Sequence, residues 1–397
     1  MTATADAIVI GGGSTGCSIA YHLASRGLKV LLMERRHIAS GSTGSSPGII
    51  RQYYSDPVVS LLARESLLCF QSWKEELGGD CGFVRTGFLT GSSGIDTDRM
   101  VTNVQLRQRQ GIRIEFLTPS EMQKLQPDMI TDGLGGGAYE PDAGYCDTVA
   151  TTSTLVAAFR RHGGTVIEGK SVTRIRVSGG RVLGVETSMD IIDAPIVVNA
   201  AGPWAPQLAG TIGNQLPIHV SRHSVTMLGP TARRMLDEQV GYAELAARFY
   251  LRPDQHNRCL VGSLDAGDSI ETDPDACDPV VGCETAARYR DRAATRFRRL
   301  VGAPIRYGWA SFFDDTPDGN PIVGQDPGVS GSFVAAGMSG HGFKLCPVLG
   351  RGIAEMIVLG RTELPIEHFS LGRFSKYDRS DSRKQTGADV PDVSGSE

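Results

Sequence analysis

The feature that most constrains this chain is a glycine-rich turn near its start. The apolar run AIVI at residues 7–10 is followed directly by GGGSTG, which places glycines at Gly11, Gly13 and Gly16. A short apolar run of this kind is typical of a buried parallel strand. In the G-x-G-x-x-G spacing, the first glycine permits a tight turn, the second lets a pyrophosphate approach the backbone, and the third lets the next helix pack closely.

The residues after this turn complete a dinucleotide-binding unit. We predict a helix over 14–26, whose first N–H groups face the phosphates, and a second buried strand over 28–33. Glu34 follows that strand directly, where a carboxylate accepts hydrogen bonds from a ribose. The order of strand, glycines, helix, strand and acid therefore indicates an adenine dinucleotide, and it leaves FAD and NAD as alternatives.

Composition excludes several classes of function. The 397 residues are 40% hydrophobic and carry a net charge of −4, which predicts a globular protein without a basic surface for nucleic acid. The eight cysteines form no C-x-x-C pair and show no zinc spacing, so we expect reduced thiols in a cytoplasmic protein and no metal site. No apolar stretch reaches the roughly 18 residues of a membrane span, and the N-terminal run lacks the basic leader of a signal peptide.

Two later segments share the small-residue character of the first turn. Residues 40–48 read SGSTGSSPG, which is too polar and too rich in glycine for regular structure. Such a loop is either an ordinary surface connection or, because it follows a dinucleotide strand, a cover over the cofactor. Residues 337–344 read GMSGHGFK, between a predicted strand at 331–336 and a predicted helix at 345–359. The chain therefore ends with the same order of strand, glycine turn and helix with which it begins.

The rest of the chain alternates between helical and strand patterns. Helices are predicted over 57–78, 98–110, 148–163 and 285–300, strands over 83–90, 165–168, 172–177, 181–187, 194–199 and 305–313, and a strand-rich block over 218–262. The glycines of 133–137 predict a flexible connection, and the arginines of 285–300 predict a solvated helix face. The polar tail 375–397 is predicted to be disordered.

One cation is notable for its neighbours. Arg51 lies in the run IIRQYY, between apolar and aromatic residues. Such an arginine either lies at the surface with its stem along apolar groups, or it grips a carboxylate through two parallel hydrogen bonds. The residues leave both interpretations open.

Five segments together resemble one family of flavoenzymes. They are GGGSTG with Glu34, SGSTGSSPGIIRQYY, NAAGPWA, TPDGNPIVG and AAGMSGHGFK, within residues 7–360. They resemble the D-amino-acid oxidase and sarcosine oxidase family of FAD-dependent oxidoreductases, and most of all its sarcosine oxidase and dimethylglycine dehydrogenase branch. The resemblance implies FAD as the cofactor and oxidation of a C–N bond in an amine or amino acid.

The resemblance also implies a fold and a domain division. The fold is α/β with an α+β substrate part, in which a Rossmann-like FAD-binding domain is interleaved with a mixed-sheet substrate domain. The FAD-binding domain is predicted over 1–82, 148–217 and 305–372, and the substrate domain over 83–147 and 218–304.

Site residues follow from the same resemblance. The cofactor residues implied are Gly11, Gly13, Ser14, Thr15, Gly16, Glu34, Arg35, Ser42, Thr43, Gly44, Ser45, Ser46, Val172, Ala201, Gly202, Trp204, Gly340, His341, Gly342, Phe343 and Lys344. Arg51 and Lys344 match the cations that bind the substrate carboxylate in sarcosine oxidases, which agrees with a carboxylate clamp at Arg51. A protonated amine cannot give up its electrons, so a base is expected, and His223, Tyr54 and Tyr250 are the candidates. Each of the three is otherwise an ordinary core residue.

The departures from the family pattern bear on chemistry. Some relatives attach FAD through a histidine in the loop that matches 42–48 or through a cysteine before TPD. Here that loop has no histidine and Ser311 is the nearest match to the cysteine, so we predict non-covalent FAD. The FFDD of 312–315 lacks the arginine that D-amino-acid and glycine oxidases place there. Residues 250–262 lack the lysine that activates oxygen in sarcosine-type oxidases, which leaves the electron acceptor open.

The function expected is oxidation of a secondary amine or N-methyl amino acid to an imine, with hydrolysis of the product and reoxidation of the flavin by oxygen. One alternative is a dehydrogenase subunit that passes electrons to a partner protein. Two others are a tailoring oxidase for an unusual amino-acid intermediate and an FAD-binding subunit without chemistry of its own. The sequence does not set the substrate or the oligomeric state.

Overall fold

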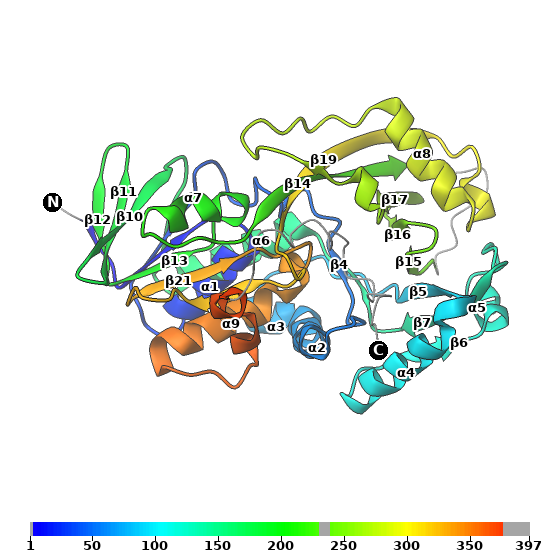
Figure 1. Cartoon of the computed structure of the whole chain (residues 1–397), viewed down its shortest axis with the longest axis horizontal. Coiled ribbons are helices and arrows are strands. Elements are labelled where there is room, and N and C mark those ends of the chain that lie inside the picture. The colour runs from blue at the N-terminus through cyan, green and yellow to red at the C-terminus, as the bar shows by residue number, and fades with distance from the viewer. Residues whose placement is uncertain (1–2, 230–238, 376–397) are drawn as a thin grey trace.

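The computed structural model describes residues 3–229 and 239–375. The tail that was predicted to be disordered lies outside these ranges from residue 376 onward. Figure 1 shows two halves side by side, with α1, α9 and the strands around them in one half and α4, α5 and α8 in the other. A cavity lined by residues of both halves lies where they meet.

The first half is built on a sheet in the order β20-β21-β13-β2-β3-β9. Its central strand β2 (Ala7–Ile10) is parallel to both β3 (Val30–Met33) and β13 (Ile196–Asn199). Every residue of β2 and β3 is buried, as expected for strands covered on both faces. Helix α1 (Ser14–Ala24) follows β2 and packs against α9 (Gly342–Leu359).

The second half is built on a larger mixed sheet. In the described part its order is β18-β14-β17-β16-β15-β5-β7-β6, and β19 also pairs with β14. Helix α8 (Cys283–Ala294) packs on β14, β16, β17 and β19, while α4 (Thr97–Arg109) packs on β7 and its neighbours. Strand β19 (Ile305–Asp315) therefore belongs to this sheet, although the predicted FAD-binding range began at residue 305. The domain division as a whole stays a prediction.

The remaining elements connect or cover these two sheets. The other helices are α2 (Pro57–Gln71), α3 (Trp73–Leu77), α5 (Pro119–Leu125), α6 (Thr148–Arg161) and α7 (Ala205–Gly210). The other strands are β1 (Ala3–Thr4), β4 (Ile49–Ile50), β5 (Phe88–Ser93), β6 (Glu115–Leu117), β7 (Leu134–Glu140), β8 (Gly144–Tyr145), β9 (Thr165–Ile167), β10 (Val172–Ser178), β11 (Arg181–Thr187), β12 (Ile191–Asp193), β14 (His219–Leu228), β15 (Gly241–Glu244), β16 (Phe249–Asp254), β17 (Arg258–Ser263), β18 (Ile270–Glu271), β20 (Ile322–Gln325) and β21 (Ser332–Ala336).

Most of the predicted helices and strands are present, but several begin or end at other residues than predicted. The single helix predicted over 57–78 is two helices, α2 and α3, which meet at Ser72. The helix predicted over 285–300 ends at Ala294. The flexible connection predicted over 133–137 is wrong, because these glycines lie largely in strand β7.

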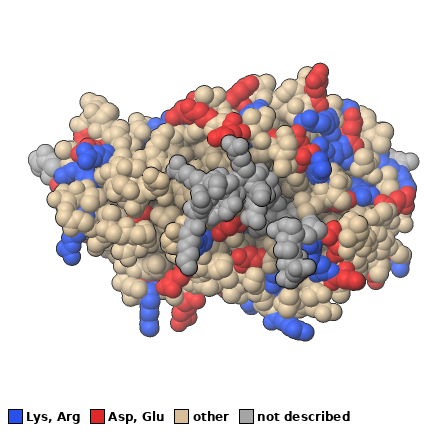
Figure 2. Space-filling view, in the orientation of Figure 1, with Lys and Arg blue, Asp and Glu red and all other residues tan. Residues whose placement is uncertain are grey.

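Arginines at the end of α8 and just after it hold carboxylates of the second half. Arg296, two residues beyond the end of α8, donates to the buried Glu244 carboxylate through Nε at 2.6 Å and through Nη2 at 2.7 Å. Arg292 ion-pairs with both Asp265 and Asp268. On the face shown in Figure 2, positive and negative side chains are interspersed. In the described ranges no helix is long and apolar enough to cross a membrane.

Candidate active site

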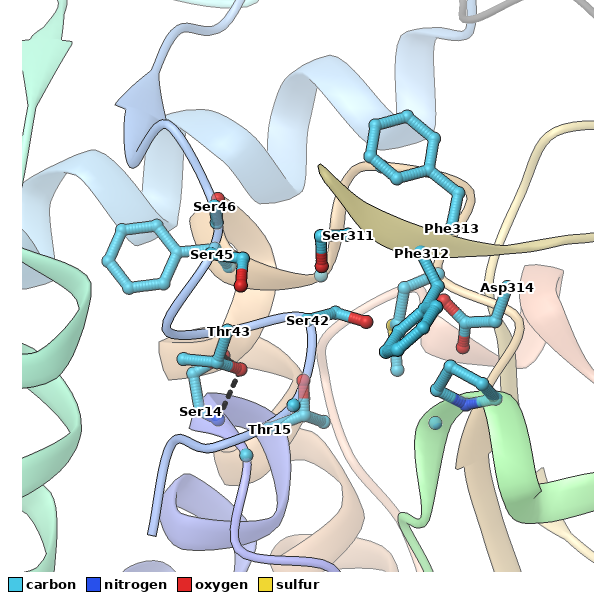
Figure 3. Close-up of a pocket in the computed structure, with 18 of the residues that line it drawn as sticks. Ser14, Thr15, Ser42, Thr43, Ser45, Ser46, Ser311, Phe312, Phe313 and Asp314 are labelled. Carbon is cyan, nitrogen blue, oxygen red and sulfur yellow. Dashed lines mark hydrogen bonds between the residues drawn. The ribbon is translucent and has the colours of Figure 1, made fainter. Parts of the chain in front are cut away.

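A cavity of about 570 Å³ lies between the two halves, within the size range of ligand pockets. Figure 3 shows its centre, where Ser42, Thr43, Ser45 and Ser46 lie between the start of α1 and the end of strand β19. Every site residue predicted from the sequence lines this cavity except Gly44. Gly44 instead packs against the carbonyl of Ala39, which accepts a hydrogen bond from its N–H at 2.9 Å.

The first turn has the geometry that its glycines predict. Gly11 has a φ of +110°, which side chains rarely adopt, and a Cβ there would meet the Ala200 carbonyl oxygen at 2.3 Å. A Cβ on Gly16 would lie 2.0 Å from the Gly11 carbonyl oxygen. The two glycines therefore let α1 begin directly against the strand, with its N-terminus at the cavity.

Glu34 is held at the end of β3 by backbone donors. Its Oε2 accepts a hydrogen bond from the Gly12 N–H at 2.7 Å, and its Oε1 accepts one from the Arg36 N–H at 2.7 Å. The carboxylate lines the cavity and is 9% exposed. These hydrogen bonds hold the carboxylate beside the glycine turn, where the sequence predicts a ribose-binding acid.

The cavity continues past Glu34 to a cation stacked on an indole. The Arg35 guanidinium carbon lies 4.6 Å from the Trp204 ring centroid, and Arg35 also ion-pairs with Asp275 at 2.7 Å. The Trp204 Nε1–H donates to the same carboxylate at 3.0 Å. The predicted residues Val172, Ala201 and Gly202 line the same cavity.

The loop 42–48 is attached to both halves. The Ser14 N–H at the start of α1 donates to Thr43 Oγ1 at 3.1 Å, as the dashed line in Figure 3 shows. From the other half, the Trp309 Nε1–H donates to the Ser45 carbonyl at 2.9 Å, and Arg252 Nε donates to the Pro47 carbonyl at 2.6 Å. The loop therefore covers the cavity and is not a simple surface connection.

The second glycine turn forms the opposite wall. Helix α9 begins at Gly342, three residues earlier than predicted, so Phe343 and Lys344 lie in its first turn. The buried Asp314 carboxylate accepts a hydrogen bond from the Gly337 N–H at 2.8 Å and so holds the start of this turn. Burial raises the pKa of Asp314 to about 6.

Arg51 and Lys344 approach the same aromatic ring. The Arg51 guanidinium carbon lies 4.1 Å from the Tyr54 ring centroid, and Lys344 Nζ lies 5.8 Å from it. Arg51 also donates to the Tyr53 carbonyl, and Lys344 Nζ donates to the Gly340 carbonyl at 3.1 Å. Two cations from segments almost 300 residues apart in sequence thus line one part of the cavity.

His223 lies on β14 with a hydrogen-bond network behind it. Its Nε2 is 2.9 Å from Ser221 Oγ and 3.3 Å from Ser269 Oγ, and Ser221 in turn donates to Asp315. The imidazole stacks on the Phe313 ring at 3.8 Å between centroids. Burial lowers the pKa of His223 to about 4, so the ring is neutral at pH 7.

Tyr250 lies on β16 and lines the cavity. Burial raises the pKa of its hydroxyl, so the phenol stays protonated at neutral pH. The sequence prediction missed several wall residues of the second half. Phe88, Thr90, Val225 and Phe313 lie on its strands, and Asp265 and Ser269 lie in the connection between β17 and β18. No motif marked these six residues as part of a site, and it is the fold of the second half that brings them to the cavity.

Comparison with known proteins decides the family. A model of the family DAO, described as FAD dependent oxidoreductase, matches residues 6–356. The chain belongs to this family. The predictions of the family, the α/β fold class, the FAD cofactor and an oxidoreductase enzyme are thereby confirmed.

Relatives of this family member include both long and short proteins. Sarcosine dehydrogenase, mitochondrial, of Homo sapiens is 30% identical over 393 residues, which cover 94% of this chain and 42% of that protein. Glycine oxidase of Geobacillus kaustophilus is 26% identical, with 94% and 98% covered. The chain therefore spans about two-fifths of the sarcosine dehydrogenase and nearly all of the glycine oxidase.

Solved structures agree with this assignment. L-proline dehydrogenase from P. horikoshii has a TM-score of 0.87 at 26% identity, with 95% of this chain and 99% of that chain covered. Glycine oxidase from Geobacillus kaustophilus has a TM-score of 0.83 at 25% identity, with 94% and 99% covered.

The cavity itself fits FAD. Gly16 lies so close to Gly11 that a Cβ on Gly16 would clash with the Gly11 carbonyl oxygen. The N-terminus of α1 faces the cavity, as it does in a phosphate-binding site. In the described part of the chain, the buried Ser42 Oγ has no hydrogen-bond partner, which a cofactor oxygen or nitrogen would satisfy.

Proposed function

We propose that this enzyme oxidises the C–N bond of a secondary amine or N-methyl amino acid to an imine, which water then hydrolyses. The observation that carries the proposal is the approach of Arg51 and Lys344 to the Tyr54 ring inside the cavity. Among the relatives, sarcosine dehydrogenase, dimethylglycine dehydrogenase and 4-methylaminobutanoate oxidase are named for amines with both a methylated nitrogen and a carboxylate.

The residues that would hold FAD extend along the whole cavity. The first turn and the N-terminus of α1 would hold the pyrophosphate, Glu34 the ribose, and Val172, Ala201 and Gly202 the adenosine half. The loop 42–48 and the first turn of α9 would hold the remaining half. When bound, FAD supplies an acceptor for two electrons from the substrate. We propose that it is held non-covalently, so acid precipitation leaves a colourless protein; yellow protein would contradict this.

Arg51 and Lys344 would bind the substrate carboxylate. A guanidinium binds a carboxylate through two parallel hydrogen bonds, and the ammonium of Lys344 adds a second cation. Both side chains are at least partly buried, which strengthens their attraction for an anion. A substrate held at one end in this way presents its nitrogen and neighbouring carbon in one orientation.

His223 is the strongest candidate for the residue that takes the proton of the substrate amine. Because Ser221 donates its hydrogen to Asp315, its oxygen accepts from His223 Nε2–H, and this assignment leaves Nδ1 as the basic nitrogen. A ring that is neutral at pH 7 can accept a proton, and among its charged neighbours Asp268 favours the protonated form while burial opposes it. Tyr250 and Tyr54 remain alternative contacts for the amine.

The electron acceptor is proposed to be oxygen, with a protein partner as the second candidate. Two lysines, Lys170 and Lys344, line the described cavity, and Lys170 ion-pairs with Asp190. The missing lysine in 250–262 favours the second candidate. Release of peroxide under air would support oxygen, and slow reoxidation by air with fast reoxidation by a dye would support a protein acceptor.

An anaerobic screen tests the proposal. Sarcosine, dimethylglycine, L-proline, 4-methylaminobutanoate and glycine are each added to the FAD-loaded enzyme while the absorbance of oxidised flavin is followed. We expect bleaching by at least one secondary or tertiary amino acid. An enzyme that no amine or amino acid bleaches would contradict the proposal and favour an FAD-binding subunit without chemistry.

A further inference from the structure

Arg51 lies in a segment that has no regular structure of its own. Residues 51–55 connect β4 to α2 and belong to no helix or strand. A segment of this kind cannot be held by backbone ladders, so side chains from elsewhere must satisfy its N–H and carbonyl groups. Its position decides where the Arg51 guanidinium lies in the cavity.

A buried carboxylate holds the first part of this segment. Glu140, the last residue of β7, is 0% exposed, and its Oε2 accepts a hydrogen bond from the Gln52 N–H at 2.5 Å. Burial raises the pKa of Glu140 to about 7, while Arg51 and the N–H groups of Gln52 and Tyr53 favour the ionised form. Glu140 does not line the cavity, so it reaches the site through this segment.

A buried guanidinium holds the second part. Arg107 of α4 is 3% exposed. Its Nε donates to the Tyr54 carbonyl at 3.1 Å and its Nη2 donates to the Ser55 carbonyl at 2.7 Å. Its Nη1 donates to Gln110 Oε1 at 3.0 Å. The Glu140 carboxylate therefore accepts a hydrogen bond from an N–H group of this segment, and the Arg107 guanidinium donates hydrogen bonds to two of its carbonyl groups.

We propose that Glu140 and Arg107 are positioning residues, which hold residues 51–55 and thereby orient Arg51 toward the carboxylate of a bound substrate. Both come from the second half of the molecule, so elements of that half set the position of Arg51, which follows the loop 42–48 in the chain. Hydrogen bonds to charged groups are stronger and more directional than those between neutral groups, which suits this task. The inference rests on the proposed role of Arg51.

The test measures binding of an anion and of its neutral counterpart to the FAD-loaded enzyme. Benzoate and benzamide have the same ring, and their binding is followed by the change in flavin absorbance. Glu140→Gln keeps the size of the side chain, and Arg107→Lys keeps the charge. We expect each variant to weaken benzoate binding about tenfold, since one charge-assisted hydrogen bond is worth roughly that factor, and to leave benzamide binding unchanged.

Controls separate positioning from loss of structure. Asp326→Asn removes a different carboxylate, 3% exposed and bound to Ser332, and should leave both affinities unchanged. The KM for a carboxylate substrate should rise in Glu140→Gln and Arg107→Lys with little change in kcat. Should Glu140→Gln fail to retain FAD, Arg107→Lys decides the question on its own.

The outcomes also separate this inference from the proposed function. Arg51→Met is measured beside the other variants. Weaker benzoate binding in Arg51→Met with unchanged binding in Glu140→Gln or Arg107→Lys would overturn the inference and leave the proposed function standing. Unchanged benzoate binding in Arg51→Met would overturn the carboxylate clamp itself. Equal weakening of benzoate and benzamide would show a general structural role and overturn positioning.

Discussion

Single residues in this protein carry charge where the surroundings disfavour it. Glu140 and Asp314 are buried carboxyls whose pKa values are raised to about 7 and about 6 by burial. Each accepts a hydrogen bond from the backbone of a segment that carries one of the two cations, Arg51 or Lys344. Buried acids of this kind lower stability above their pKa, and their retention is understandable where they fix a site.

The Asp314 carboxyl predicts a pH dependence of stability. Its folded pKa of about 6 exceeds the ordinary 3.8, so the protein loses stability as pH rises from about 4 to about 6. Asp314→Asn removes this loss, and its stability relative to wild type should improve over that range by up to about 3 kcal/mol. The melting temperatures of the two proteins, measured from pH 4.5 to pH 7.5 at roughly one-unit steps, check this. Two curves that stay parallel would contradict it.

At the scale of elements, sequence patterns predicted correctly those turns and helices whose conformation depends on neighbouring residues in the chain. The turn at Gly11 and Gly16 could be predicted because strand, turn and helix are adjacent in sequence. The glycines of 133–137 gave the wrong answer because their environment is distant: a Cβ on Gly136 would meet the Phe116 ring at 2.3 Å. In β7 the absent side chains make room for neighbouring strands, which no local pattern reveals.

The same limit applies to the site. The cofactor turn and the two cations could be predicted from motifs, whereas Glu140 could not, because it is 88 residues from its partner Gln52. Asp314, near the end of β19, is 23 residues from its partner Gly337, which follows β21. A residue that positions a distant segment has no fixed spacing from that segment in the sequence. It can therefore be recognised only once the fold is known.

The first turn of α1 gives a prediction at this scale. A Cβ in Gly16→Ala would lie 2.0 Å from the Gly11 carbonyl oxygen, so α1 must move away from the turn that faces the cavity. We expect this variant to purify without FAD, as shown by the ratio of flavin to protein absorbance. Gly210→Ala, in α7, is the matched control because a Cβ there meets nothing within 4 Å. Normal flavin content in Gly16→Ala would refute this account of the turn.

At the scale of the whole molecule, both halves hold the loop 42–48. Trp309 and Arg252 of the second half donate to the carbonyls of Ser45 and Pro47, while Ser14 of the first half donates to Thr43. The active site therefore depends on how the halves are joined. The cytoplasmic location stays a prediction.

Trp309→Phe tests this connection. The change removes the Nε1–H that binds the Ser45 carbonyl and keeps an aromatic ring. We expect FAD to bind about fivefold more weakly, the value of one ordinary hydrogen bond, in a titration of the cofactor-stripped protein. Trp73→Phe is the control, because in the described residues the buried Trp73 Nε1 has no hydrogen-bond partner. Equal affinities for both variants would show that the connection does not support FAD binding.

The central claim is that Arg51 and Lys344 select a carboxylate-bearing amine for oxidation by FAD. The most direct measurement is the anaerobic rate of flavin bleaching by an N-methyl amino acid and by the matching amine without a carboxylate, in wild type and in Arg51→Met. We predict that the variant loses about 100-fold in rate at low concentration of the acid and changes little with the plain amine. An equal loss for both compounds, or no loss for the acid, would contradict the claim.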